Sequence, residues 1–164
     1  MTKASHFVRN GEEIRSVPYE YTESGLQGIF LHSGYETADI DGETFVSVID
    51  TEGLHRCIGE HIVFNRKELS SEEVKFLRKT LDMTQSELGR WIGQSGQQIA
   101  RWEKGQSTIP GPADRLLRAI FLFQTMDEEE RDEFIELLQS LDEMDEQPPQ
   151  RLDFRFEEGW KDAA

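Results

Sequence analysis

The sequence predicts an α+β fold, in which a small N-terminal antiparallel β-sheet with one helix precedes a five-helix bundle. Before residue 50, short β-branched or aromatic runs alternate with polar residues, which is typical of half-buried strands. From Ser71 to Leu141, apolar residues recur at helical spacing between residues that start and end helices. The length of 164 residues suits one domain or two very small ones.

The N-terminal sheet is expected to contain three strands. Residues 17–22 alternate between bulky and polar side chains, and residues 29–31 form a short apolar run. The β-branched run 44–49 follows Asp41-Gly42, a dipeptide typical of hairpin turns. Residues 1–16 are polar, and we expect them to form a loose arm.

One helix should follow the sheet. Asp50 or Thr51 can cap its first turn, and Leu54, Ile58 and Ile62 recur on one face at helical spacing. After a polar connector, the bundle begins. Its five helices are expected over residues 71–81, 85–92, 96–104, 112–121 and 127–141. The second and third are delimited by capping and helix-ending residues, namely Thr84, Gly93, Ser95 and Gly105.

The tail, residues 147–164, admits two interpretations. It is either a disordered extension or a strand that joins a sheet edge, in this chain's own N-terminal sheet or in a partner's. Leu152, Phe154 and Phe156 alternate with charged residues, and Trp160 follows. Four large apolar side chains are too many for an inert tail, so we favour the strand.

The net charge of −15 argues against binding nucleic acid or anionic membranes through the overall field of the protein. The charge is unevenly distributed, however: it is −7 over residues 1–65, +3 over residues 66–125 and −11 over residues 126–164. Two interpretations are open. Either the acidic flanks only keep the protein soluble, or the middle of the chain contacts an anion while the flanks meet a basic partner.

Several functional classes have no support in the sequence. Cys57 is the single cysteine, so an intramolecular disulfide and a cysteine-rich zinc site are excluded. His55 and Cys57, two positions apart on a helix, face different sides, so we expect no metal. No catalytic triad, carboxylate pair or phosphate-binding glycine loop has a convincing spacing, and we expect neither enzymatic activity nor a cofactor. Without a signal peptide or membrane span, we expect a cytoplasmic protein with no membrane partner.

The most informative segment is the pair of short helices that meet at Gly93-Gln94-Ser95. Their spacing predicts a steep mutual angle with four apolar side chains enclosed between them, namely Leu88, Ile92, Ile99 and Trp102. Glutamine can bond bidentately to adenine, and arginine to guanine or phosphate. Gln97, Gln98 and Arg101, on the outer face of the second of these helices, are therefore the candidates for base readout. Two alternatives remain: the helical domain is a protein-interaction bundle without DNA binding, or Arg101 is only a solvated helix residue.

Five further residues are candidates for contacts to the DNA backbone. Thr84 and Gln85 lie beside free backbone N–H groups at the positive end of a helix dipole, which suits a phosphate. Ser95 has the same place on the next helix. Lys104 and Thr108 follow that helix and can hold the backbone from the other side.

Two motifs carry a family resemblance: LxMTQSELG from Leu81 and IGxSxxxIxRWExG from Ile92. They resemble the Cro/repressor-type (XRE) helix-turn-helix family over residues 70–125. The resemblance implies that Gln85 meets phosphate, that the outer face of the second helix reads bases, and that Arg78 pairs with Glu103.

This chain departs from the family pattern at two glycines. Gly89 stands where the family usually has alanine, so the first helix of the pair is either weaker or packed more closely. Gly96 stands at a position often used for base contact and offers only backbone there.

Three further motifs, YxYTESGL from Tyr19, GLH from Gly53 and IPGPADR from Ile109, are similar to two-domain bacterial regulators related to antitoxins. In such regulators an N-terminal β-containing domain precedes the same helical domain. Relatives often carry an N-terminal CxxC zinc site, which this chain lacks.

We therefore expect an N-terminal partner or dimerisation domain over residues 1–65, a helix-turn-helix DNA-binding domain over residues 66–146, and the tail. The expected function is a transcriptional regulator, a repressor that binds a palindromic double-stranded operator as a homodimer. The alternative is an antitoxin of a type II toxin–antitoxin pair, which neutralises a basic toxin and represses its own operon.

Overall fold

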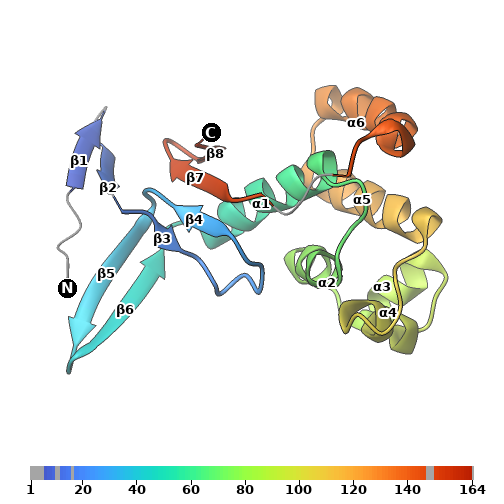
Figure 1. Cartoon of the computed structure of the whole chain (residues 1–164), viewed down its shortest axis with the longest axis horizontal. Helices are drawn as coiled ribbons and strands as arrows, with labels where there is room; N and C mark the ends of the chain where they lie inside the picture. The colour runs from blue at the N-terminus through green and yellow to red at the C-terminus, as the bar shows by residue number, and fades with distance from the viewer. Residues whose placement is uncertain (1–5, 10–11, 16, 147–149, 164) are drawn as a thin grey trace. The chain divides into compact units, whose positions relative to one another are not determined.

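The computed structural model describes residues 6–9, 12–15, 17–146 and 150–163 (Figure 1). The chain divides into two units: unit 1 comprises Met1–Cys57 with Pro149–Ala164, and unit 2 comprises Ile58–Pro148. The division falls inside helix α1 (Thr51–Asn65), whereas the sequence suggested a boundary at the end of this helix. Helices and strands are both present, so the predicted α+β class is confirmed.

Unit 1 contains the strands and the start of α1. The strands are β1 (His6–Arg9), β2 (Glu12–Arg15), β3 (Tyr19–Glu20), β4 (Ile29–Leu31), β5 (Tyr35–Ile40), β6 (Glu43–Val48), β7 (Leu152–Phe156) and β8 (Trp160–Asp162). In the described residues they form a four-stranded sheet of order β3-β4-β7-β8 and two separate hairpins, β1-β2 and β5-β6.

Three expectations about unit 1 were wrong. The run 44–49 does not join the sheet that contains residues 19–20 and 29–31, because β6 pairs with β5 in a separate hairpin. The N-terminal arm is not loose throughout, because β1 and β2 pair as an antiparallel hairpin in which Arg9 lies opposite Glu12. The four-stranded sheet is not purely antiparallel either, because β4 and β7 run parallel. A parallel pair cannot be closed by a tight turn, and β7 indeed comes from the far end of the chain.

The tail contributes a strand to the sheet of its own chain, which is one of the two positions considered for a tail strand. Ile29 lies opposite Leu152, and Leu31 lies opposite Phe154. Leu31 and Phe154 are fully buried, so β7 completes the core of unit 1. Trp160 on β8 donates its indole N–H to the carbonyl of Asp50, at 3.0 Å.

The turns around α1 follow from local sequence. Asp41 and Gly42 both have positive φ, 51° and 84°, as the predicted two-residue hairpin turn requires. Asp50 caps α1 by accepting a hydrogen bond from the backbone N–H of Gly53, at 3.0 Å. Inside the helix, His55 Nε2 lies 2.9 Å from the Tyr21 hydroxyl, which ties α1 to the strand segment.

Unit 2 consists of helices, in which the end of α1 precedes the five predicted ones. These are α2 (Ser71–Thr80), α3 (Gln85–Ile92), α4 (Gly96–Glu103), α5 (Gly111–Thr125) and α6 (Glu128–Ser140), which is followed by a short 3-10 helix (Leu141–Glu143). The cap of α2 is Ser70, because Ser70 and Glu73 form a reciprocal capping box.

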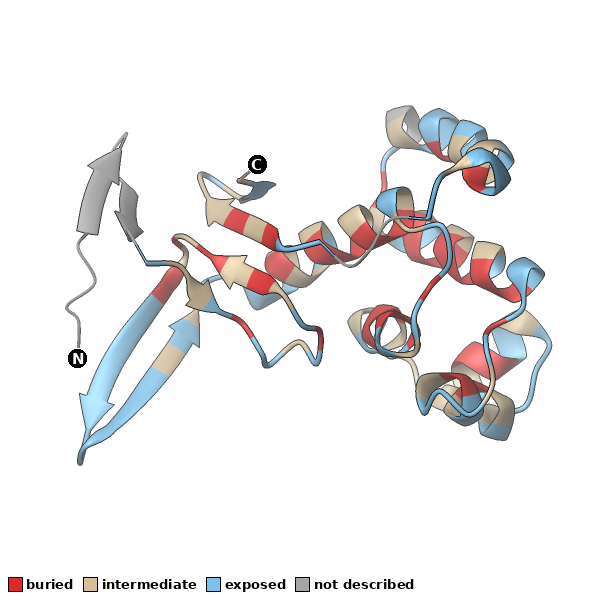
Figure 2. Cartoon of the chain, in the orientation of Figure 1, coloured by how far each residue is buried: buried red, intermediate tan, exposed pale blue. Residues whose placement is uncertain are grey.

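The core of unit 2 lies between α2, α3, α4 and α5, where Figure 2 shows buried residues on each helix. Leu77, Leu88, Ile99, Leu117 and Phe121 are fully buried. Three charged residues among those described in unit 2 are also buried, namely Glu73, Asp114 and Arg118, and Arg118 on α5 has no exposed surface. Within the described residues, no helix is both long and apolar enough to cross a membrane.

Candidate nucleic-acid interface

Helices α3 and α4 are short, and local residues determine where each begins. Thr84 Oγ1 accepts from the backbone N–H of Glu87 at 3.1 Å, and the Glu87 carboxylate accepts from the N–H of Thr84 at 2.7 Å. Ser95 Oγ accepts from the N–H of Gln98 at 3.1 Å. Gly93 ends α3 in the left-handed region with φ 77°. The predicted caps Thr84 and Ser95 and the predicted helix end at Gly93 are confirmed.

Two glycines let α3, the turn and α4 approach closely. A Cβ atom at Gly89 would lie 2.4 Å from the carbonyl oxygen of Gln94. A Cβ at Gly96 would lie 2.9 Å from Ser86 Oγ and 3.2 Å from Ser86 Cα. Of the two consequences considered for Gly89, the closer packing is therefore the one observed.

The side chains enclosed between the two helices are mostly those expected. Leu88, Ile99 and Trp102 are buried, with Trp102 only 2 % exposed. Ile92 is half-buried rather than enclosed, because it lies at the end of α3 next to the turn. One face of α4 is thus fixed in the core, which determines the face that α4 turns outward.

A hydrogen-bonded network holds α4 in place. Arg78 on α2 forms a bidentate pair with Glu103 at the end of α4, with N–O distances of 2.5 and 3.1 Å, and donates to the carbonyl of Met83. Gln85 on α3 donates to the same carboxylate at 2.8 Å. The ion pair implied by the resemblance is therefore confirmed, and it connects three helices.

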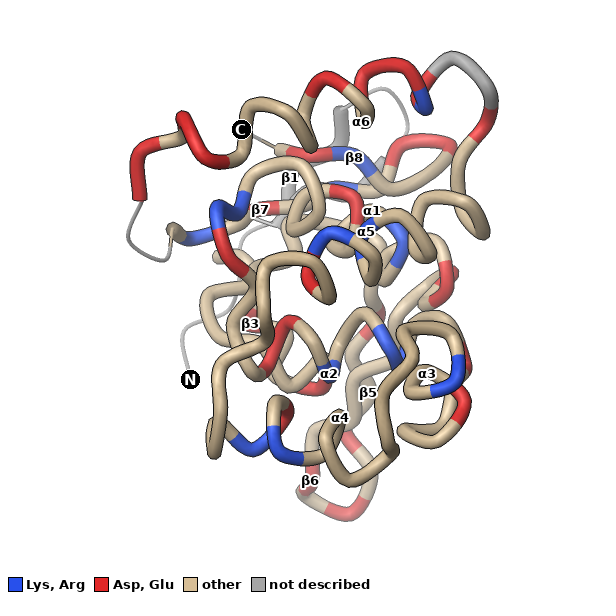
Figure 3. The backbone as a smooth tube through the Cα atoms, turned by 90° about the vertical axis from the view of Figure 1, so that its right-hand side faces the viewer, with Lys and Arg blue, Asp and Glu red and all other residues tan. Residues whose placement is uncertain are grey.

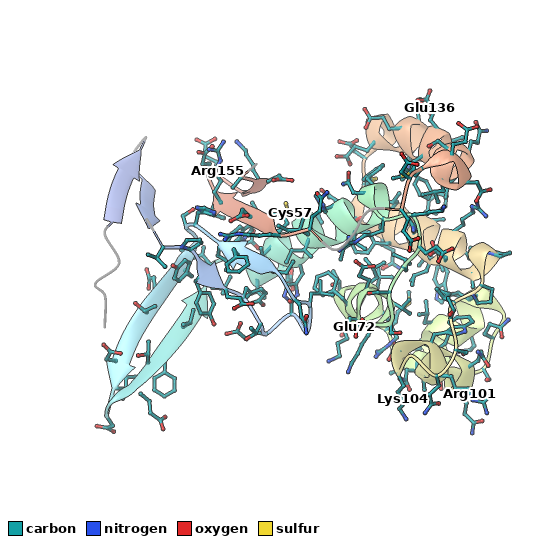
Figure 4. The ribbon with its side chains drawn as sticks, in the orientation of Figure 1. Cys57, Glu72, Arg101, Lys104, Glu136 and Arg155 are labelled. Atoms are coloured by element: carbon teal, nitrogen blue, oxygen red, sulfur yellow. The ribbon has the colours of Figure 1, made fainter. Side chains whose placement is uncertain are left out.

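The outward face of α4 carries polar and cationic side chains. Gln97, Arg101 and Lys104 are exposed, and their spacing of four and three residues places them in one row along the helix. Figure 4 shows Arg101 and Lys104 extending away from the protein at the α4 end of unit 2. These side chains can therefore reach a ligand without any rearrangement of the core.

Gln98 is placed differently from Gln97. It is half-buried, and its amide Nε2 donates to Ser107 Oγ at 3.3 Å, across to the segment that follows α4. An amide carries two N–H donors and one carbonyl acceptor, so this bond orients the group and leaves a donor and the acceptor for a base edge. This contact joins residues nine positions apart, and the sequence alone did not reveal it.

The candidates for backbone contact flank this row. Thr84, Ser95, Lys104 and Thr108 are exposed, while Gln85 is half-buried through its bond to Glu103. Thr108 and Ser107 also line a pocket of about 260 Å³ together with Ser70, Ser71 and Trp102. The pocket combines these hydroxyl groups with apolar side chains and the carboxylate of Glu72, so its lining does not by itself favour a phosphate.

The electrostatics of unit 2 differ between its helices. Figure 3 shows Asp and Glu along α6, while Lys and Arg occur together with Asp and Glu around α2, α3 and α4. Glu87, an acidic residue near the start of α3, is engaged in capping: the backbone N–H of Thr84 lowers its pKa below the ordinary value. Among the described residues, no group of three potential metal ligands is present.

Comparisons with protein-family models, with curated proteins and with solved structures give no match.

Proposed function

We propose that this protein is a sequence-specific DNA-binding regulator of the XRE type, in which α3 and α4 are the helix-turn-helix and α4 is the recognition helix. One observation carries the proposal: α4 buries Ile99 and Trp102 on one face and exposes Gln97, Arg101 and Lys104 on the other. An exposed row of amide and guanidinium groups on a firmly held helix suits the major groove.

The surroundings of each side chain indicate whether it contacts bases or phosphates. Gln97, Gln98 and Arg101 supply base readout, and the Ser107 hydroxyl sets the orientation of the Gln98 amide. Lys104, with the capped starts of α3 and α4, binds phosphates and sets the register on DNA. The bond between Gln85 and Glu103 leaves one amide N–H of Gln85 for a phosphate.

The charge distribution supports specific over non-specific binding. The segment over residues 66–125 has a net charge of +3, while the rest of the chain is strongly acidic. Non-specific affinity depends mostly on phosphate neutralisation, so the acidic flanks penalise it. Recognition then depends on a few base contacts.

A single unit of this kind reads only half of a site. The proposed active form is therefore a homodimer on a palindromic operator, with the two α4 helices about 34 Å apart. Unit 1 is the proposed partner or dimerisation module, and repression is the proposed outcome of binding. The antitoxin alternative keeps the same DNA-binding unit and adds a basic protein partner.

Selection of bound DNA from a random library tests the proposal. We expect enrichment of an inverted repeat whose half-site centres lie about one helical turn apart. The same selection with a Gln97→Ala/Arg101→Ala variant should lose that enrichment, while a Leu116→Ser variant, changed at an exposed position of α5, should keep it. If the full chain enriches no repeat at any salt concentration tested, the proposal is wrong.

A further inference from the structure

We propose that the outward face of the β5–β6 hairpin binds a basic protein through an apolar centre with an acidic rim. This hairpin belongs to unit 1, and the proposal goes beyond DNA binding. In Figure 2 almost the whole hairpin is coloured as exposed.

The register of the hairpin defines its two faces. Ala38 lies directly opposite Phe45, and Ile40 lies two residues further along β5, diagonal to Phe45. The face shared by these residues consists entirely of exposed positions, which are Glu36, Ala38, Ile40, Glu43, Phe45 and Ser47. Ala38 and Phe45 form the middle pair, Ile40 lies next to them at the turn end directly opposite Glu43, and Glu36 lies at the other end.

The opposite face contacts the rest of unit 1 near its base, whereas Thr37, Asp39 and Thr44 on that face are exposed. Tyr35 is buried at the base of β5, its ring centroid lies 5.2 Å from that of Tyr19, and Val46 and Val48 are half-buried. Alternation along a strand should therefore place polar residues on the outward face. Phe45 and Ile40 instead point outward and are 50 % and 56 % exposed.

The hairpin also lacks neighbouring strands. Among the described strands, β5 and β6 pair only with each other. A two-stranded sheet by itself is marginally stable in water. A partner that covers the apolar centre would remove Phe45 and Ile40 from water and order the hairpin at the same time.

Charge decides the class of partner. Residues 35–48 contain four carboxylates, Glu36, Asp39, Asp41 and Glu43, and no Lys, Arg or His. This field repels nucleic acid and anionic membranes, and it equally repels the same face of a second copy of the chain. A protein surface that combines Lys or Arg with apolar side chains is complementary to it.

Carboxylates on a hairpin have an alternative explanation, because charges on edge strands prevent aggregation. That role accounts for Asp39 and Asp41 but not for the contiguous exposed Ile40 and Phe45, which favour aggregation. An apolar centre within a polar rim is instead the usual anatomy of a protein interface.

The test is a selection of displayed random peptides on the full-length protein, with an Ile40→Ser/Phe45→Ser variant for counter-selection. We expect the enriched peptides to combine Lys or Arg with apolar residues. A synthetic copy of the most enriched peptide should bind the variant about tenfold more weakly than the native chain, by fluorescence anisotropy. Glu36→Gln/Glu43→Gln should also weaken binding and reduce its salt dependence.

A Phe123→Ser variant is the matched control, because Phe123 is 71 % exposed on α5 in the other unit, and it should bind the peptide normally. All changed positions are exposed, so unchanged circular dichroism and thermal unfolding should accompany these effects. The proposal is overturned if no peptide is enriched, or if enriched peptides are neutral or acidic, or bind both proteins equally.

Two other occupants of the face would give different results. If the Ile40→Ser/Phe45→Ser variant lowers the mass measured by sedimentation, the face joins copies of this chain. If it changes affinity for selected DNA, the hairpin belongs to the DNA interface. Either result overturns the proposal, and a failure to bind DNA at all would leave the peptide result unaffected.

Discussion

At the scale of single residues, Gly89 shows how a departure from a family pattern becomes a structural requirement. Alanine has a higher helix propensity than glycine, by about 1 kcal/mol. In this chain, however, a methyl group at Gly89 would overlap the carbonyl oxygen of Gln94. Backbone cannot give way as a flexible side chain can, so the clash should outweigh the propensity.

We therefore expect Gly89→Ala to lower the free energy of unfolding by about 1 kcal/mol or more, since overpacking costs about 1–3 kcal/mol. Urea unfolding followed by circular dichroism measures this change. Gly111→Ala is the matched control: its Cβ would come no nearer than 3.6 Å to any non-neighbouring atom, so it should not destabilise. Equal stability of the two variants would refute the close contact.

The same scale shows which parts of the site the sequence could predict. The caps Thr84 and Ser95 depend on contacts three residues away, so local sequence reveals them. The partner of Gln98 is nine residues away and that of Gln85 is eighteen residues away. Such contacts depend on how helices are placed, which spacing along one helix does not determine.

At the scale of elements, Arg118 joins α5 to the end of α1. It donates to the carbonyls of Val63, Arg66 and Lys67 at 2.8, 2.7 and 3.2 Å, and to Asp114 at 2.6 Å. Its guanidinium therefore satisfies carbonyls at and beyond the C-terminus of α1, which have no partner within that helix.

We expect Arg118→Ala to lower the free energy of unfolding by about 3–5 kcal/mol, because Asp114 becomes a buried charge without its cation. Arg115→Ala on the same helix breaks an exposed pair with Asp142 and should cost less than about 1 kcal/mol. Urea unfolding of both variants provides the comparison. A similar loss in the two variants would contradict the structural role of Arg118.

The attachment of β7 should depend on pH through Asp153. Its carboxylate lies 2.7 Å from His32 Nε2 and accepts from Arg151 at 2.8 Å. Burial by itself would raise the pKa of Asp153, but the hydrogen bonds from Arg151 and His32 hold it below the ordinary value of 3.8. A lowered pKa means that the charged form of Asp153 stabilises the fold. Its contribution to the free energy of unfolding is therefore complete above pH 4 and disappears as the pH falls further.

Asp153→Asn should therefore reduce stability at pH 7 by a few tenths of a kcal/mol to about 1 kcal/mol, as expected for a partly exposed pair. Below pH 4 the difference from the native chain should shrink, because the protonated acid resembles the amide. Urea unfolding at pH 7 and at pH 3 measures both. A difference that stays constant with pH would contradict this role of the charge.

Elements with local signals were predictable, and those with distant partners were not. The starts and ends of α3 and α4 follow from capping and glycine residues. The parallel pairing of β4 with β7 joins segments more than one hundred residues apart, so alternation revealed the strand but not its register. The β1–β2 hairpin was missed because the polar composition outweighed Asn10-Gly11, a dipeptide typical of hairpin turns.

At the scale of the whole molecule, both units are net acidic, −7 in unit 1 and −8 in unit 2, and the net positive charge is confined to residues 66–125 within unit 2. Unit 2 presents Arg101 and Lys104 beside exposed amide groups, while unit 1 presents an acidic hairpin. A protein with this pattern can bind DNA through one unit and a basic protein through the other.

The central claim is that α4 reads bases, and the most direct measurement is the sequence preference of Arg101→Ala compared with that of Lys104→Ala. Both variants and the native chain are taken through selection from one random DNA library. We expect Arg101→Ala to lose preference at one base pair of each half-site and about 1–3 kcal/mol of affinity for the native site. Lys104→Ala should bind every sequence more weakly but keep the same preferences. Identical base preferences in all three proteins would contradict the claim.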